Sequence, residues 1–309
     1  MSETLYDVLI IGGGPAGLTA GLYTSRAKLK TLLVERMILG GQVMTTTKVE
    51  NYPGFPGGID GPDLMVRFQE HCQEFGLETM TGEVTGLVDK GQVKVVTVDD
   101  REISARAVII TTGAEPSKLG IPGETEFTGR GVSYCATCDG AFFRDVPVAI
   151  IGGGDTAAEE ALFLCRFASK VYLVHRRDEL RATKVLQDRI FANDKIEPVW
   201  DSVVEEVVGD NTGVTSLVLK NRKDESSQKL DVVGMFVAVG VTPKAHFLAD
   251  ILDLTPEGYV LAESDCQTSM PGVFAAGDVR KKILKQIATA VGDGAIAAIV
   301  AEKYLDDLE

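Results

Sequence analysis

Two segments of this 309-residue chain match each other without gaps at an offset of 140 residues. The first runs from Tyr6 to Arg36 and the second from Val146 to Arg176, and 12 of the 31 aligned positions are identical. Each copy reads as an apolar strand, a glycine-rich turn, a helix and a second apolar strand, which is the beginning of a βαβ unit. A lone G-x-G-x-x-G pattern is a weak signal, but in both copies it follows an apolar run and opens a helix. We therefore predict two dinucleotide-binding modules rather than two ordinary α/β turns.

Three positions of each glycine-rich turn have separate physical roles. The first permits the tight turn, the second lets a pyrophosphate approach the backbone, and the third keeps the helix close to the strand. The free N–H groups and positive dipole end of the helix then hold the phosphates. These positions are Gly12, Gly14 and Gly17 in the first copy and Gly152, Gly154 and Ala157 in the second.

The two copies differ where the second strand ends. Glu35 lies 23 residues after Gly12, where a carboxylate accepts hydrogen bonds from ribose hydroxyls. At the same offset the second copy has His175, followed by Arg176 and Arg177, with Arg181 one turn further on. Such a basic cluster would bind a 2′-phosphate that a carboxylate would repel. The first copy is therefore interpreted as a site for FAD or NAD and the second as a site for NADPH; the alternative for the arginines is a solvated helix face.

The remaining pattern predicts an α/β protein with two Rossmann-like dinucleotide-binding domains, the second inserted into the first. The first domain is predicted to comprise residues 1–113 and 246–309, and the second residues 114–245. Glycine- and proline-containing stretches at 113–122 and 240–247 would be the two crossings. Further strands are predicted at 94–98, 107–112, 203–208, 214–219, 232–241 and 272–278, and a helix at 283–305.

Charge and hydropathy narrow the function classes. With 31 basic and 45 acidic side chains the net charge is −14, which argues against a nucleic-acid-binding surface. No run approaches the roughly 18 apolar residues of a membrane span, and Met1-Ser2-Glu3-Thr4 lacks the pattern of a signal peptide. We expect a cytoplasmic protein that binds neither nucleic acid nor membrane.

Cys135 and Cys138 are the two cysteines of the chain that lie close together in sequence. Cys138 precedes Gly152 by 14 residues. Two cysteines separated by two residues can be metal ligands, a redox dithiol or chance neighbours. A structural zinc site normally needs a second Cys or His pair, which is missing here, so no metal is expected. No His follows Cys138, which excludes covalent haem attachment. A redox-active disulfide is favoured, with Asp139 as the acid that moves a proton during exchange, or alternatively as a turn or helix-capping residue.

This order of modules suggests a relay from NADPH to flavin, from flavin to the disulfide, and from the dithiol to an outside acceptor. With these residues in place, the chain resembles the low-molecular-weight bacterial thioredoxin reductases over nearly its whole length. The motifs that carry the resemblance are GGGPAG, GGQ with the following TTxxVENYPG, GRGVSYCATCDG, GGGDTAAEEA, HRRDELRA and GVFAAGD.

The resemblance implies a homodimer whose NADPH domain rotates against its FAD domain, and a thioredoxin or thioredoxin-like partner. It implies Cys135 and Cys138 as the redox pair and Asp139 as the acid. The FAD contacts predicted on this basis are Gly12, Gly14, Gly17, Glu35, Gly41, Gln42, Asn51, Gly113, Asp278 and Gln286. The predicted NADPH contacts are Gly154, Asp155, Thr156, His175, Arg176, Arg177 and Arg181. As alternatives, Gln42 and Asn51 could satisfy loop backbone groups, and Asp278 could cap the following helix.

The chain departs from the family pattern at two places. Ala141-Phe142-Phe143 follows the CDG motif where many members have Phe-Phe directly, so Phe142 and Phe143 could contact the partner, as could Arg130, or the two rings could lie in the core. Lys285 stands before Gln286 where many members have Arg, which keeps the charge but loses the forked geometry.

Four other functions compete with a thioredoxin-disulfide reductase. A ferredoxin–NADP reductase on the same fold would lack the cysteine pair. The reductase subunit of a peroxide-reducing system would have an additional N-terminal domain, whereas the first strand here begins near Tyr6. A dithiol oxidase would not need the His-Arg-Arg cluster. A nucleotide-binding module without flavin would be colourless when purified.

Overall fold

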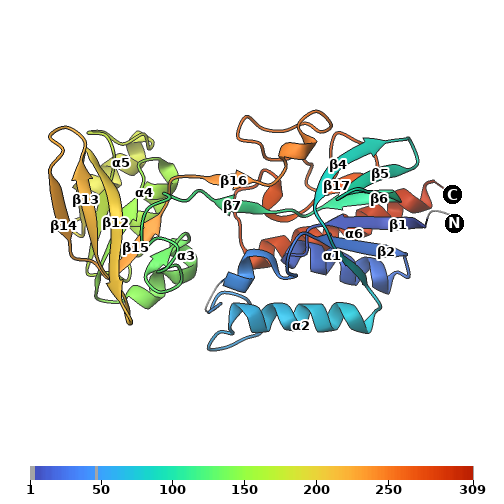
Figure 1. Cartoon of the computed structure of the whole chain (residues 1–309), viewed down its shortest axis with the longest axis horizontal. Coiled ribbons are helices and arrows are strands. Elements are labelled where there is room, and N and C mark those ends of the chain that lie inside the picture. The colour runs from blue at the N-terminus through green and yellow to red at the C-terminus, as the bar shows by residue number, and fades with distance from the viewer. Residues whose placement is uncertain (1–3, 46–47, 309) are drawn as a thin grey trace. The chain divides into compact units, whose positions relative to one another are not determined.

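The computed structural model describes residues 4–45 and 48–308, and the chain divides into two compact units. One unit consists of Met1–Glu115 with Thr242–Glu309, and the other of Pro116–Val241. The two crossings contain strands β7 (Ala114–Pro116) and β16 (Val241–Pro243), which pair with each other (Figure 1). Met1, Ser2, Glu3 and Thr46, which contributed to the predictions above, lie outside the described residues.

The first unit is built on a seven-stranded sheet in the order β3-β2-β1-β6-β5-β4, with β17 also paired to β6. Strands β1, β2, β3, β6 and β17 form parallel pairs, whereas β4, β5 and the first half of β6 form an antiparallel meander. The strands are β1 (Leu5–Ile11), β2 (Thr31–Glu35), β3 (Glu78–Thr81), β4 (Val84–Asp89), β5 (Lys94–Val98), β6 (Arg101–Ile110) and β17 (Val273–Ala275).

Alternate residues of β1 and β6 point to opposite faces of this sheet, so each face has its own core. Val8 and Ile10 pack with α1, α2 and α6, while Leu9 and Ile11 pack with β4, β5 and the segment around Leu248. Figure 1 shows α1 and α6 side by side along the first of these faces. The helices are α1 (Pro15–Arg26), α2 (Gly61–Glu74) and α6 (Ile287–Asp306), with short 3₁₀ turns η1 (Gly41–Thr45), η3 (His246–Leu248) and η4 (Gly277–Val279).

The second unit repeats the arrangement on a smaller scale. A parallel sheet has the order β11-β10-β9-β15-β8, and a three-stranded antiparallel sheet has the order β12-β13-β14. Its strands are β8 (Val132–Ser133), β9 (Pro147–Ile151), β10 (Lys170–Val174), β11 (Ile196–Val199), β12 (Ser202–Asp210), β13 (Gly213–Asn221), β14 (Ser227–Leu230) and β15 (Gly234–Val237). Its helices are α3 (Ala136–Asp139), α4 (Asp155–Leu164) and α5 (Lys184–Phe191), with the 3₁₀ turn η2 (Gly140–Phe143).

The predicted α/β class is confirmed, because the two copies of the repeat form β1-α1-β2 and β9-α4-β10 with parallel strands. Three predicted elements were too long. The strand predicted at 272–278 covers only Val273–Ala275, because the 3₁₀ turn η4 begins at Gly277. The run at 232–241 is a single strand only over Gly234–Val237, since Gly240 adopts a positive φ of 133° that interrupts it before β16. The C-terminal helix begins at Ile287 rather than at 283, because Gln286 and Thr289 form a capping box there.

Within residues 4–45 and 48–308, no helix combines the length and the apolar character that crossing a bilayer requires.

Candidate active site

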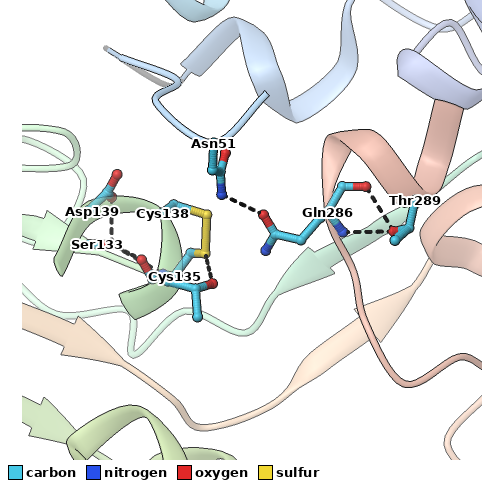
Figure 2. The surroundings of a disulfide bond; sticks show 8 residues. Asn51, Ser133, Cys135, Cys138, Asp139, Gln286 and Thr289 are labelled. Carbon is cyan, nitrogen blue, oxygen red and sulfur yellow. Dashed lines mark hydrogen bonds between the residues drawn. A yellow bond between two sulfur atoms is a disulfide. The ribbon is translucent and has the colours of Figure 1, made fainter. Parts of the chain in front are cut away.

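The cysteine pair lies at the start of a short helical turn in the second unit. Cys135 is the N-cap of α3 and Cys138 lies within it, and a disulfide joins them with their Cα atoms 5.3 Å apart (Figure 2). The Sγ atom of Cys135 is 3.3 Å from the hydroxyl of Thr137, a residue exposed between the two cysteines. Cys72, Cys165 and Cys266 are free, so the predicted pair is the one that is oxidised.

Ser133 connects the acid to the backbone of the disulfide loop. Its hydroxyl donates to Asp139 Oδ2 at 2.7 Å, and the same oxygen accepts the N–H of Cys135 at 3.1 Å (Figure 2). Burial raises the pKa of Asp139, and the bond from Ser133 opposes that rise only partly. Asp139 is therefore held next to the cysteines with an increased tendency to carry a proton. Ser133 was not predicted; its signal was a hydroxyl two residues before Cys135, where such side chains commonly bond the backbone.

A second carboxyl group faces the disulfide turn from α4. Burial raises the pKa of Glu160 to about 7, opposed in part by the backbone N–H of Ala136. Its Oε2 atom is buried and has no hydrogen-bond partner in the part of the chain that the structure describes. The sequence analysis missed Glu160, because a glutamate in the middle of a helix is ordinarily predicted to face solvent.

The two phenylalanines after the disulfide turn have different environments. Phe143 meets the ring of Phe236 edge-on at 5.1 Å and belongs to the partly buried margin of the core. Phe142 is 46% exposed. The core alternative therefore describes Phe143, whereas the ring of Phe142 lies at the surface. Arg130 is exposed and stacks its guanidinium 5.4 Å from the ring centre of Phe127.

The first glycine-rich turn is a cradle that side chains would fill. Gly12 has φ 107°, and a Cβ atom there would lie 2.6 Å from the carbonyl oxygen of Thr111. A Cβ at Gly17 would lie 1.9 Å from the carbonyl oxygen of Gly12, so α1 can approach β1 only with glycine at this position. At Gly14, the N-cap of α1, the nearest atom to such a Cβ is Gly41 Cα at 4.0 Å. Open space therefore lies in front of the helix N-terminus, as a bound pyrophosphate requires.

Other predicted flavin contacts of the first unit make hydrogen bonds within the protein. Glu35 Oε2 accepts the N–H of Gly13 at 2.7 Å, which places the carboxylate beside the turn. Asn51 Nδ2 donates to Gln286 Oε1 at 2.9 Å (Figure 2), while Gln42 donates to the carbonyl of Ala114. Gln42 therefore makes the kind of bond that the alternative described, a bond to a backbone group of a loop.

Asp278 has an unsatisfied acceptor. Its Oδ1 atom is buried without a hydrogen-bond partner among the described residues, and Lys282 Nζ lies 3.7 Å away. Burial raises its pKa, whereas the ammonium groups of Lys282 and Lys285 lower it. Because α6 is capped by Gln286, the helix-capping alternative for Asp278 is not what the structure has. A buried free carboxylate oxygen fits a ligand hydroxyl, as in the polyol chain of a flavin nucleotide.

Two glycines complete the flavin prediction. Gly41 and Gly113 have positive φ angles of 59° and 71°, and no atom lies within 4 Å of a Cβ built at Gly113. The backbone at Gly113 is therefore open to a ligand.

The second glycine-rich turn has the same open N-terminus. A Cβ at Gly152 would lie 2.5 Å from the carbonyl oxygen of Ala238 and 2.7 Å from Ala157 Cβ, so the helix and strand are in close contact. No atom lies within 4 Å of a Cβ built at Gly154, the N-cap of α4. The residues fit a dinucleotide phosphate in the same way as the first turn does.

The basic cluster divides into exposed arginines and a buried histidine. Arg176, Arg177 and Arg181 are exposed, whereas His175 is 4% exposed. Asp155 Oδ1 accepts the N–H of Thr183 at 2.6 Å, which ties the cluster's loop to the start of α4. Thr156 is exposed next to Asp155. The structure thus brings the arginine loop to the glycine-rich turn, and it separates His175 from the three guanidinium groups by burial.

Comparison with known proteins identifies the family. The model of the pyridine nucleotide-disulphide oxidoreductase family matches residues 6–294. A thioredoxin reductase of Listeria innocua is 49% identical over 99% of this chain and 96% of its own length, and that of Bacillus subtilis is 46% identical over 99% and 97%. The crystal structure of a Streptococcus pyogenes thioredoxin reductase has a TM-score of 0.96 at 46% identity, covering 99% of this chain and 100% of that one. A thioredoxin reductase from Giardia duodenalis has a TM-score of 0.93 at 38% identity, covering 98% and 100%. The chain therefore belongs to the pyridine nucleotide-disulphide oxidoreductase family, among its thioredoxin reductases.

Proposed function

We propose that this chain transfers reducing equivalents from NADPH, by way of FAD, to the disulfide of a thioredoxin or thioredoxin-like protein. The observation that carries the proposal is the Cys135–Cys138 disulfide, which lies in the same compact unit as a glycine-rich turn joined to three exposed arginines. When bound, the nicotinamide supplies a hydride and the flavin supplies the resulting electron pair to a disulfide.

FAD belongs in the domain predicted at residues 1–113 and 246–309. Gly14 leaves space at the N-terminus of α1 for its pyrophosphate, and Gly17 lets α1 approach β1. Glu35 lies beside the turn and would accept from a ribose, and Asp278 offers a buried acceptor for a hydroxyl. The remaining proposed contacts are Gly12, Gly41, Gln42, Asn51, Gly113 and Gln286. NADPH belongs in the domain predicted at residues 114–245, on Gly154, Asp155, Thr156, His175, Arg176, Arg177 and Arg181.

The cysteines exchange disulfides with the partner once they are reduced. One thiolate attacks the partner's disulfide and forms a mixed disulfide, and the other then attacks that bond. The partner leaves as a dithiol with two electrons and two protons, and the Cys135–Cys138 disulfide forms again. Asp139 lies beside the cysteines as the acid that would give a proton to a departing thiolate.

We extend the proposal to a cytoplasmic homodimer. A disulfide that must be reduced in every cycle fits a compartment that keeps thiols reduced. Ile296 and Ile299 of α6 are each 41% exposed and give that helix an apolar surface that a second copy could cover.

The test is an assay of NADPH oxidation with FAD and an oxidised thioredoxin, with free thiols counted at the end. The proposal predicts two thioredoxin thiols for each NADPH consumed, and neither consumption nor thiols from Cys138→Ser in this coupled reaction. NADPH consumption that produces peroxide without thioredoxin thiols would instead support a dithiol oxidase or a plain NADPH oxidase.

A further inference from the structure

The turn between β13 and β14, residues 222–226, is bonded to the arginine loop. The Nη1 atom of Arg222 donates to the carbonyl oxygen of Arg176 at 3.4 Å. Asp201, just before β12, donates its backbone N–H to the carbonyl of Arg177 at 3.2 Å, and its own carbonyl accepts the N–H of Arg222 at 2.6 Å. The backbone of both neighbouring arginines is therefore held by this turn or by the residue that bonds to it.

Lys223, in the same turn, pairs with an acid of the arginine loop. Its Nζ atom lies 3.0 Å from Asp178 Oδ2 and 2.9 Å from Asp201 Oδ2. Hydrogen bonds to Asp201 and Asp178 raise the pKa of Lys223, and the bond from Lys223 lowers the pKa of Asp178, so both members of the pair are charged at neutral pH. Asp178 directly follows Arg176 and Arg177 in the chain, so a negative charge belongs to the basic cluster itself.

This ion pair affects the charge of the loop more than the stability of the fold. The side chains of Lys223 and Asp178 are 63% and 68% exposed, and ion pairs at such positions add little to the free energy of folding. A carboxylate beside the arginines would, however, repel a phosphate bound there, because charges interact over a Debye length of about 8–10 Å at ordinary salt concentrations. The ammonium group of Lys223 offsets that repulsion where it arises.

We propose that the β13–β14 turn extends the nucleotide site and that Lys223 is a specificity-determining residue, which favours a 2′-phosphate by neutralising Asp178 beside the arginines. Arg222 and Asp201 keep this lysine at the loop. The inference rests on the proposed function of the second unit as the NADPH module, and it adds a residue from outside the motif that carries the arginines. Since NAD⁺ lacks the 2′-phosphate, the charge of Lys223 affects the binding of NADP⁺ and leaves that of NAD⁺ unchanged.

The test compares the dissociation constants of NADP⁺ and NAD⁺, measured by calorimetry on the FAD-loaded protein without turnover. Lys223→Gln leaves Asp178 uncompensated and should weaken NADP⁺ about threefold at low ionic strength, with NAD⁺ unchanged. The difference from the unchanged protein should disappear in about 1 M salt, where the Debye length is about 3 Å. Lys229→Gln is the matched control: it removes an exposed lysine of β14 that pairs with Asp231 at 2.9 Å, and it should change neither constant.

A second substitution separates the effect of charge from that of structural support. Asp178→Asn removes the acid, so this variant should bind NADP⁺ at least as tightly as the unchanged protein does. Lys223→Gln combined with Asp178→Asn has the same local charge as the unchanged protein and should regain the affinity that Lys223→Gln loses.

Circular dichroism and flavin absorbance establish that each variant is folded. Three results would overturn the proposal: unchanged NADP⁺ binding in Lys223→Gln, equal weakening of both nucleotides in that variant, or no recovery in the double variant. If the unchanged protein binds NADP⁺ no more tightly than NAD⁺, the proposed function of the second unit fails instead.

Discussion

The hydroxyl of Ser133 donates a 2.7 Å hydrogen bond to Asp139, and through its own oxygen it also accepts the N–H of Cys135 at 3.1 Å. A single side chain thus links the acid to the disulfide loop. The bond stabilises the ionised carboxylate, while burial of Asp139 favours the protonated one.

Removing this bond should change the pH profile of disulfide exchange. In Ser133→Ala the carboxylate loses its donor, so the pKa of Asp139 rises further and the acid stays protonated to higher pH. The high-pH limb of thioredoxin reduction is expected to move up by about one pH unit, the equivalent of one charged hydrogen bond. Ser133→Thr keeps the hydroxyl and should keep the profile. A profile unchanged in Ser133→Ala would mean that Asp139 is not the titrating acid.

Two glycines of the first turn should respond differently to the same substitution. Gly17→Ala forces a methyl group to 1.9 Å from the Gly12 carbonyl oxygen, so we expect unfolding to become easier by about 1–3 kcal/mol or more. Gly14→Ala meets nothing closer than 4.0 Å, so the fold should persist while the added methyl group occupies the space for the pyrophosphate. Thermal unfolding and bound flavin absorbance are the two measurements. A Gly14→Ala protein with full FAD content would contradict the proposed FAD site.

The arginine loop should determine which nucleotide is used. Replacing Arg176 and Arg177 together by Gln removes two exposed charges and should raise the KM for NADPH about tenfold or more, with little change for NADH. Arg189→Gln removes a charge from an exposed position on α5 in the same unit and serves as the control. Equal losses with both nucleotides in the double variant would show that the arginines support the loop rather than bind the 2′-phosphate.

Glu160 should make stability depend on pH. Its pKa is about 7 in the folded chain against an ordinary value of 4.5, so between these values the folded state keeps a proton that the unfolded state releases. The free energy of unfolding should therefore fall as pH rises from about 4.5 to 7 and then level off. Glu160→Gln cannot titrate and should lose this part of the slope, which denaturant unfolding at several pH values measures. A slope unchanged by the substitution would contradict the raised pKa.

Much of the fold follows from short-range pattern. The repeat predicted both βαβ units, because apolar runs, glycine-rich turns and helix starts are local signals that the parallel sheets require. The strand at Lys94–Val98 follows from its apolar residues in the same way. The start of α6 was missed by four residues, since the choice depends on a capping box between Gln286 and Thr289 rather than on hydropathy.

The candidate site was less accessible to sequence reasoning. The cysteines, Asp139 and the glycines carry motifs, and Gly12 and Gly152 lie at the predicted turns between a strand and a helix. Ser133 and Glu160 carry no motif, because their relevance comes from side chains brought together by folding. His175 does carry a motif, and its contact with the nucleotide stays a prediction. The sequence did not indicate that its ring is buried against Gly153, because that contact depends on how the turn folds over the end of β10.

The central claim is that NADPH reduces the Cys135–Cys138 disulfide through the flavin. The most direct measurement is an anaerobic titration of the FAD-loaded protein with NADPH, followed by mass spectrometry of alkylated cysteines. The account predicts that two thiols appear, at Cys135 and Cys138, and that Cys135→Ser still takes up electrons on its flavin but gains no such pair. Flavin reduction that leaves the disulfide intact in the unchanged protein would contradict the account.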